Sequence, residues 1–424
     1  MPAGLTNQQS VTLTVADTRG EPGKDERSSL AGAATRIALG EVLPWPMPRF
    51  GVAVAPEEVP AAFAALERFR DLMPRHLLLH FDPATCHDAE ALAALARLAE
   101  ALPHTLVTLE CVIPGLAEPA LELRDIAELA AASGLRPTAV VVGPSVDRRS
   151  TPPGSAWPKC PPLDEVYRAA RAAFPGVKVG GGMFSYFTEL NRKPVPVQDL
   201  DFATHATCPI VHAADDARVM QTLEALPFVT RTAESILGTT PYHLGPTTIG
   251  MRQNPYGSRT MPNPDGRRIA MAADDPRQRG LFAAAWLVGY AARLAGSGVA
   301  SWTGASFTGP RGLMAGTGAV VPAFHVAKGL AALSGCQRLA LDSADRTRLD
   351  GFAALRPDGT TEVWVANLTA HDQLIDLGDL APSNVSILDL DSFDAAATGP
   401  VPARSAVPAT LGAYAVLRFL VRPA

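Results

Sequence analysis

Short apolar runs alternate with longer helical stretches along most of the chain. The runs are rich in β-branched residues and have the length of strands, whereas the stretches between them carry Ala and Leu at helical spacing. After a proline-rich hinge at 43–48, eight such runs lie at 50–54, 76–81, 105–111, 139–143, 177–183, 202–207, 242–249 and 299–303. Eight strand-then-helix units predict an α/β fold, a (β/α)8 TIM barrel over residues 46–336. A doubly wound sheet is the competing architecture, but no G-x-G-x-x-G motif follows the first strand.

The pattern changes to a period of two near residue 337. Runs at 351–355, 362–367, 385–389 and 412–420 have the alternation of half-buried strands, and no helical pattern follows. Residues 337–424 are therefore predicted to form a small antiparallel, β-sandwich-like domain packed on the barrel. The first 45 residues are polar and contain one predicted strand, at 10–15.

Composition narrows the classes of function. The chain is 47% hydrophobic, enough for a large core, and its net charge of −5 gives no electrostatic reason to expect nucleic acid as a partner. It has neither a signal-peptide pattern nor an apolar run of about 18 residues, so no membrane partner is expected. The five cysteines are widely spaced without a C-x-x-C pair, which disfavours disulfides and structural zinc and favours a reducing cytoplasm.

The active site of such a barrel lies at the carboxyl ends of the strands, where two carboxylates are prominent. Glu110 lies in an apolar strand, where a carboxylate is costly unless it is paired or used. Glu189 follows three glycines, which indicate either a close backbone approach or a flexible turn, and it is either functional or a solvated loop residue. Other polar or aromatic residues near strand ends are His80, Asp82, Tyr186, Asn191, His205, His212, Asp215, Arg252, Asn254, Tyr256 and Trp302.

Some of these residues also have an ordinary structural interpretation. His205 and His212 are either catalytic or core histidines satisfied by the backbone. Asp215 stands just before a predicted helix and can serve as its N-cap. The long loop at 255–276 is either a lid over the site, the interpretation we favour, or a surface excursion.

Familiar hydrolase motifs are missing from the sequence. The string nearest to a G-x-S-x-G elbow, at 304–309, has the wrong spacing, and there is no Walker loop, H-E-x-x-H or EF-hand. The large retaining group of barrel glycosidases carries its two carboxylates after strands 4 and 7, about 5 Å apart. Here those strands lead into Gly-Pro-Ser at 143–145 and Gly-Met-Arg at 250–252. Ordinary glycosidase chemistry is disfavoured, while a sugar-like ligand stays open.

Four long strings, in order, resemble the D-apionate lactonase family: GGGMFSYFTELNR (180–192), THATCPIVHAADDARVMQTLEALP (204–227), IGMRQNPYG (249–257) and DPRQRGLFAAAW (275–286). The resemblance covers the barrel and, more loosely, the β-tail. It implies a bacterial enzyme that opens D-apionolactone to D-apionate in apiose catabolism, with β-domains on both sides of the barrel. Only about 45 residues precede the barrel, so residues 1–45 are interpreted as the remnant of an N-terminal β-domain.

Lactone hydrolysis needs an activated water, a stabilised oxyanion and a proton for the leaving alkoxide. Glu189 is the expected base, with Glu110 as the alternative. The remaining roles are expected as follows: His205 or His212 as proton donor; Arg252 and Asn254 on the carbonyl oxygen; Asp82, Tyr186, Asn191, Asp215, Tyr256 and Trp302 on the rest of the substrate.

No cofactor is predicted, because no tight metal-ligand cluster is visible, although a divalent metal stays open since many lactonases use one. The partner is a small sugar lactone, and the sequence makes no prediction of oligomeric state. Two alternatives remain: a glycoside hydrolase that uses Glu110 and Glu189, and a non-catalytic carbohydrate-binding protein.

Overall fold

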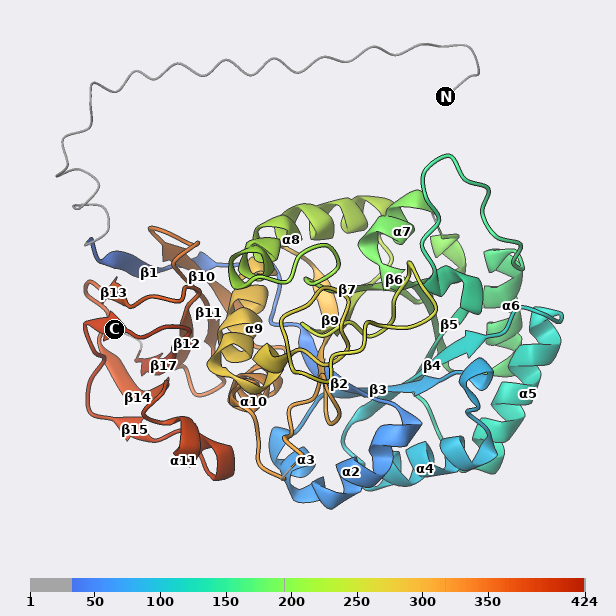
Figure 1. Cartoon of the computed structure of the whole chain (residues 1–424), viewed down its shortest axis with the longest axis horizontal. Helices are drawn as coiled ribbons and strands as arrows, with labels where there is room; N and C mark the ends of the chain where they lie inside the picture. The colour runs from blue at the N-terminus through green and yellow to red at the C-terminus, as the bar shows by residue number, and fades with distance from the viewer. Residues whose placement is uncertain (1–32, 194, 317, 423–424) are drawn as a thin grey trace, which may run out of the picture. The chain divides into compact units, whose positions relative to one another are not determined.

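The computed structural model describes residues 33–193, 195–316 and 318–422. Its central feature is a closed barrel of eight parallel strands (Figure 1). The barrel strands are β2 (Arg49–Val54), β3 (His76–Phe81), β4 (Leu106–Ile113), β5 (Ala139–Pro144), β6 (Lys178–Tyr186), β7 (Phe202–Thr207), β8 (Tyr242–Thr247) and β9 (Val299–Ser306). The predicted barrel is confirmed, and each predicted run corresponds to one of these strands.

Helices surround the barrel and cover its outer face (Figure 1). They are α2 (Val59–Ala64), α3 (Leu66–Leu72), α4 (Ala89–Glu100), α5 (Pro119–Ala132), α6 (Leu163–Ala173), α7 (Phe187–Arg192), α8 (Asp216–Leu237), α9 (Leu281–Arg293) and α10 (Pro322–Ala332). Strand residues that point outward are apolar and pack on these helices in one continuous core. No helix of the described residues is both long and apolar enough to cross a membrane.

The three glycines at 180–182 lie inside β6 rather than in a flexible turn. A Cβ on Gly182, whose φ is +124°, would lie 2.0 Å from the carbonyl oxygen of Thr204. A Cβ on Gly181 would lie 2.4 Å from the ring of Tyr167. Close packing of β6 against β7 and α6 therefore requires glycine here, which leaves the next residues of β6 to enter the site.

The C-terminal domain is built on a nine-stranded sheet in the order β15-β14-β17-β12-β11-β10-β1-β13-β16, and most of its neighbours are antiparallel. Its elements are β1 (Thr35–Val42), β10 (Gln337–Ser343), β11 (Leu349–Leu355), β12 (Thr361–Asn367), β13 (Gln373–Asp376), β14 (Pro382–Leu388), α11 (Phe393–Thr398), β15 (Ala403–Arg404), β16 (Thr410–Leu411) and β17 (Val416–Val421). The predicted β-domain is confirmed, with one short helix, α11, that its pattern does not predict.

Part of the N-terminal segment, which is predicted to be the remnant of a β-domain, belongs to the C-terminal sheet. Residues 35–42 form β1, which pairs with β10 and β13 and is thus a strand of the C-terminal sheet. A sequence pattern cannot show this pairing, because the two partners lie about 300 residues away along the chain. The strand predicted at 10–15 lies outside the described residues.

Helix α9 lies between the barrel and the C-terminal sheet (Figure 1). Every residue from Leu281 to Ala292 is buried, because α9 contacts the neighbouring helices α8 and α10 as well as β11 and β12 of the sheet. A helix that is apolar on all sides is the expected element for such a position. The buried Arg338 of β10 donates to the carbonyl oxygens of Ala291 and Leu294 at 3.1 and 2.8 Å, so the sheet also caps the end of this helix.

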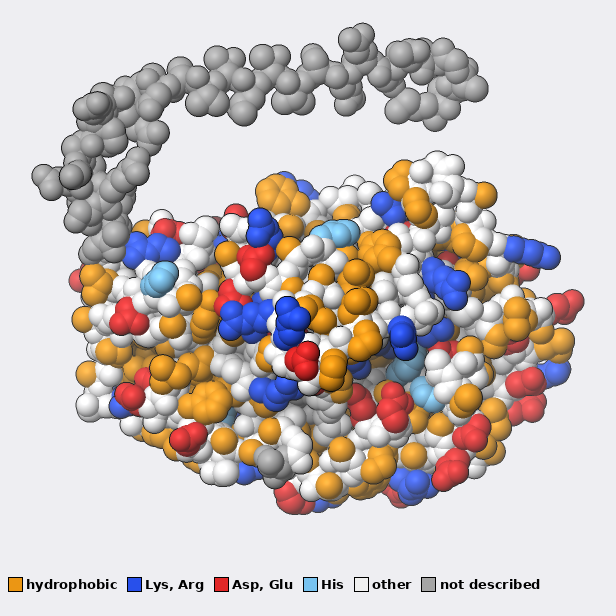
Figure 2. All heavy atoms as spheres, viewed as in Figure 1, with side chains coloured by type: hydrophobic (Ala, Val, Ile, Leu, Met, Phe, Trp, Pro, Cys, Tyr) orange, Lys and Arg blue, Asp and Glu red, His pale blue; other side chains and the backbone are white. Residues whose placement is uncertain are grey.

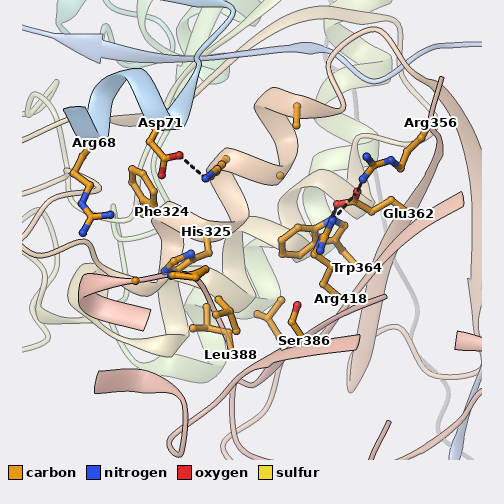
Figure 3. A pocket seen from close by; sticks show the side chains of 17 residues that line it. Arg68, Asp71, Phe324, His325, Arg356, Glu362, Trp364, Ser386, Leu388 and Arg418 are labelled. Carbon is orange, nitrogen blue, oxygen red and sulfur yellow. Dashed lines mark hydrogen bonds and ion pairs between the residues drawn. The ribbon is translucent and has the colours of Figure 1, made fainter. Parts of the chain in front are cut away.

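A cleft of about 510 Å³ separates α3 and α10 from the sheet (Figure 3). On the sheet side, the buried carboxylate of Glu362 accepts hydrogen bonds from Arg356 and Arg418, both at 2.8 Å. Across the cleft, His325 of α10 donates to the carbonyl oxygen of Ala396 at 2.8 Å, and Arg68 of α3 to that of Thr398 at 2.5 Å. The hydrogen bonds from His325 and Arg68 join the sheet domain to the side of the barrel.

The loop after β8 crosses the carboxyl ends of the strands (Figure 1). It is anchored by main-chain hydrogen bonds from Met251 to Ala272 and from Met271 to Ile210, each 2.8 Å long. Lys and Arg side chains gather around this part of the surface (Figure 2), and Arg259, Arg267 and Arg268 of the loop are exposed. The loop thus lies over the carboxyl ends of the barrel strands, and its role as a lid stays a prediction.

Candidate active site

An ion-paired cluster of three side chains lies at the carboxyl ends of the barrel strands. His80 on β3 and Glu110 on β4 occupy the same register position, so both side chains point to the same side of the barrel wall. The ring Nδ1 of His80 lies 2.7 Å from Oε1 of Glu110. Arg252, from the loop after β8, donates from Nη1 to Oε2 of Glu110 at 3.0 Å and from Nη2 to Oε1. Three strand ends that are far apart in sequence therefore meet at one carboxylate.

The charges and burial of this cluster determine the protonation state of His80. Burial alone would raise the pKa of Glu110, but Arg252 and the hydrogen bond from His80 outweigh it and hold that pKa far below its usual range. An ionised carboxylate can only accept hydrogen bonds, so Nδ1 of His80 carries the proton and donates it to Glu110. Burial lowers the pKa of His80 below its usual value of about 6.5, against the opposing effect of Glu110.

His80 is thus a neutral, oriented imidazole at neutral pH. Nη2 of Arg252 also lies 2.9 Å from Nδ1, but the shorter contact of Nδ1, at 2.7 Å, is with the carboxylate, which can only accept. The unprotonated nitrogen is then Nε2, and no residue of the described chain bonds to it. The His80 side chain retains 18% exposure at this end of the barrel. A histidine held by a buried carboxylate through one nitrogen, with the other free, is the arrangement of a general base.

Arg311 and Glu58 lie at the mouth too, although sequence reasoning passed them over. Glu58 follows β2, Arg311 follows β9, and Arg311 Nη2 lies 4.0 Å from Oε1 of Glu58. Within the described part of the chain, the guanidinium of Arg311 donates no hydrogen bond, and burial lowers its pKa. Their positions just after two barrel strands could have indicated from the sequence that both residues lie at the mouth.

Tyr186 lies at the mouth and holds the loop that carries Arg252. Its hydroxyl donates to the carbonyl oxygen of Gln253 at 3.1 Å, and the amide of Gln253 donates back to Phe184 O at 2.8 Å. Burial raises the pKa of Tyr186 far above its usual range, so the phenol stays protonated. Its place at the mouth agrees with the predicted contact to substrate. Its hydroxyl proton, however, is already donated to Gln253.

Glu189, the base expected from the sequence, lies in a different environment. It is 2% exposed, and its Oε1 accepts hydrogen bonds from Ser150 at 2.6 Å and Arg192 at 2.9 Å, while Oε2 accepts the amide of Thr151 at 3.2 Å. Both oxygens are engaged with the loop that follows β5. The geometry therefore supports a role in holding that loop rather than in activating water.

We expect Glu189→Gln to keep kcat for lactone hydrolysis within about threefold of wild type while lowering the free energy of unfolding by about 1–3 kcal/mol, because the amide loses a charge-assisted bond to Arg192. Steady-state kinetics and urea unfolding of the same preparation measure the two effects. A loss of turnover of 100-fold or more in a folded protein would return Glu189 to the role of base.

Comparisons with known proteins identify the family of this chain. The family model for the D-apionate lactonase TIM barrel domain matches residues 50–335, and that for the D-apionate lactonase C-terminal immunoglobulin-like domain matches residues 346–419. The chain belongs to the D-apionate lactonase family. A curated D-apionate lactonase from Brucella anthropi is 43% identical over 385 residues, which are 89% of this chain and 62% of that relative. The chain thus spans about three-fifths of the relative's length.

Solved structures show where else this fold occurs. A GH51 arabinofuranosidase from Xanthomonas axonopodis pv. citri aligns over 92% of this chain and 100% of its own, with a TM-score of 0.61 and 13% identity. A GH30 endoxylanase from Clostridium papyrosolvens aligns over the same shares, with a TM-score of 0.57 and 11% identity. At these identities the likeness shows the fold alone.

In this member of the D-apionate lactonase family, two of the predicted site residues are part of the core. His205 is fully buried, with Nε2 2.7 Å from the hydroxyl of Tyr242, and burial lowers its pKa to about 4. Trp302 is also fully buried and donates from Nε1 to Thr247 at 2.8 Å, with its ring stacked on Tyr290. The structural interpretation of His205 therefore holds, and neither side chain reaches the mouth.

Five other predicted residues lie outside the cluster around Glu110. Asp215 is exposed and caps α8, accepting the amide of Arg218 at 3.0 Å, as its alternative interpretation requires. The side chain of Asn254 shapes its own loop, accepting the amide of Tyr256 at 2.9 Å. His212, Tyr256 and Asn191 are exposed. None of these five positions has a partner in the cluster around Glu110.

Asp82 is fully buried and is already paired. Its Oδ2 accepts a hydrogen bond from Arg148 at 2.5 Å, and its Oδ1 accepts the amide of Ala84 at 3.0 Å. The carboxylate thus joins the end of β3 to the loop after β5, and it supports the wall of the site. Among the described residues, no group of three or more His, Cys, Asp or Glu side chains is placed to hold a metal ion.

Proposed function

We propose that this chain hydrolyses a sugar-acid lactone, with D-apionolactone as the substrate. Its place in the D-apionate lactonase family supports the substrate class, and the 43% identical relative carries the name of that activity. The observation that carries the proposal is the His80–Glu110 pair, in which Nδ1 is held at 2.7 Å and Nε2 has no hydrogen-bond partner among the described residues. Such a base is what an acyl transfer to water requires.

In the proposed reaction, His80 Nε2 removes a proton from a water molecule as the water attacks the lactone carbonyl carbon. Glu110 holds the ring in the tautomer that leaves Nε2 free, and it stabilises the imidazolium that forms. The guanidinium of Arg311, which has donors to spare, binds the carbonyl oxygen as that oxygen becomes negative. Arg252 is engaged with both oxygens of Glu110 and therefore positions the pair.

A pH-drop assay tests the proposal. A panel of aldonolactones that includes D-apionolactone is incubated with the protein beside aryl-glycosides, with and without chelator. We expect proton release with lactones and none with aryl-glycosides, because both oxygens of Glu110 are engaged with Arg252 and both oxygens of Glu189 with the loop after β5, so these two carboxylates are not free to act as a pair on a glycosidic bond. Cleavage of an aryl-glycoside would support the glycosidase alternative. Binding of the lactone without opening would support the carbohydrate-binding one.

The pH dependence should report the state of His80. The base must be unprotonated, so kcat/KM falls as pH drops through the pKa of His80. Because burial holds that pKa below about 6.5, we expect activity to be retained into mildly acidic solution before it declines. Initial rates in buffers of constant ionic strength measure the midpoint, and a midpoint above about pH 7 would contradict a buried, neutral imidazole.

The cellular setting stays a prediction. All five cysteines are free thiols, which is the state that a reducing cytoplasm maintains. The net charge of −5 continues to argue against a nucleic-acid partner.

A further inference from the structure

Glu58 lies at the end of the strand next to His80. It closes the short turn Pro56–Glu58 directly after β2, and this turn packs against β3, the strand that carries His80. Its side chain is nine-tenths buried and faces Arg311 from the loop after β9. The carboxyl ends of β2 and β3 therefore bring Glu58 and His80 to the same mouth.

The two oxygens of this carboxyl group have different surroundings. Oε2 accepts the amide of Ala55 at 3.0 Å, which fixes the orientation of the group. Oε1 accepts no hydrogen bond from the described residues, and the guanidinium of Arg311 stays 4.0 Å away from it. Gly309, at a φ of +76°, leaves room for this oxygen, because a Cβ there would lie only 2.6 Å from it. Oε1 is thus the oxygen that can carry a proton.

Glu58 and Glu110 lie at the same mouth but differ in their electrostatic surroundings. Burial raises the pKa of Glu58, and the opposing effects of the Ala55 amide and of Arg311 do not cancel it. Glu110 has a bidentate arginine and a strongly lowered pKa. Two carboxyl groups whose surroundings shift their pKa values in opposite directions form a common pattern for dividing acid and charge-stabilising roles.

We propose that Glu58 is the general acid that protonates the ring oxygen of the lactone as it leaves. This inference rests on the proposed lactonase function and adds the group that receives the alkoxide. The acyl carbon–oxygen bond of the tetrahedral intermediate breaks, and the proton on Glu58 Oε1 passes to the departing oxygen. His80 holds the proton taken from water and returns it, through solvent, to Glu58. The new carboxylic acid loses its own proton on release, so the enzyme is regenerated.

The test compares two leaving groups. The lactone releases an alkoxide, which needs a proton, whereas its ring-sulfur analogue releases a thiolate, which is stable without one. We expect Glu58→Gln to lower kcat for the lactone by about 100-fold and to leave kcat for the thiolactone within about threefold. Gln keeps an acceptor for the Ala55 amide, so the turn is preserved. The ratio of the two rates is independent of how much protein is folded.

A matched control is Glu67→Gln on α3, whose side chain is 85% exposed; both rates should stay at wild-type levels. Equal loss on the two substrates in Glu58→Gln, or a wild-type rate on the lactone, would overturn the acid role while leaving the lactonase function in place. A wild-type protein that opens no lactone in the panel would instead overturn the proposed function, and the role of Glu58 with it.

Discussion

His80→Gln is expected to lower kcat for lactone hydrolysis by about 10²–10⁴-fold in a folded protein. The substitution removes an unprotonated ring nitrogen, Nε2, whose ring is held by a buried carboxylate through Nδ1. Glutamine has no basic nitrogen, so water would have to attack without losing its proton in the transition state. Steady-state kinetics on the lactone, with circular dichroism as a check of folding, measure the effect.

Two further variants make this prediction specific. His104→Gln is a matched control, because His104 is exposed and lies before β4, at the opposite end of the barrel from the site. Glu110→Gln should also lower kcat, and the double variant His80→Gln/Glu110→Gln should lose little more than His80→Gln alone, because the two residues act as one unit. Additive losses would show that Glu110 acts independently of His80. A wild-type rate in His80→Gln would show that His80 is not the general base.

Arg252→Met is expected to lower the free energy of unfolding by about 3–5 kcal/mol at neutral pH. Glu110 is 2% exposed, and without Arg252 its negative charge would be buried with only a neutral histidine beside it. The lowered pKa of Glu110 contributes stability above the pKa of the unfolded chain, about 4.3, and that stability is lost as pH falls. In the variant, burial raises this pKa instead.

The sign of the pH dependence therefore distinguishes an unpaired buried charge on Glu110 from lost packing as the cause of the destabilisation. The difference in unfolding free energy between wild type and Arg252→Met should be largest near pH 7 and shrink towards about pH 4, where Glu110 of the variant becomes protonated. Urea unfolding at both pH values measures it. Arg259→Met, on an exposed side chain of the same loop, should change stability by less than about 0.5 kcal/mol. A pH-independent loss in Arg252→Met would point to packing alone.

Local signals were sufficient for the architecture. Each barrel strand is a short β-branched run next to an amphipathic helix, and that periodicity is a property of neighbouring residues. The same holds for the β-domain after residue 337 and for Asp215, which caps α8 where a capping residue was predicted. The family could also be inferred, because four long strings carry it.

The candidate site shows where local signals stop. Glu110 and Glu189 have the same sequence signal, a carboxylate at a strand end, and both are 2% exposed. They differ in their partners: Glu189 holds a loop through Ser150, whereas Glu110 orients His80. Likewise His205 and His80 are both strand histidines, yet both ring nitrogens of His205 have hydrogen-bond partners, whereas only Nδ1 of His80 does among the described residues.

The sequence by itself thus determined the barrel, the β-domain and the family, because each of these follows from periodicity or motif, and the rule for parallel barrels predicts the end of the barrel at which chemistry is expected. Only the tertiary structure decided that Thr35–Val42 completes the C-terminal sheet and that His80, Glu110 and Arg252 form one cluster. The physical reason is the same in both cases. Strand pairing and pKa are set by groups that lie far apart in the chain and meet only when the barrel closes.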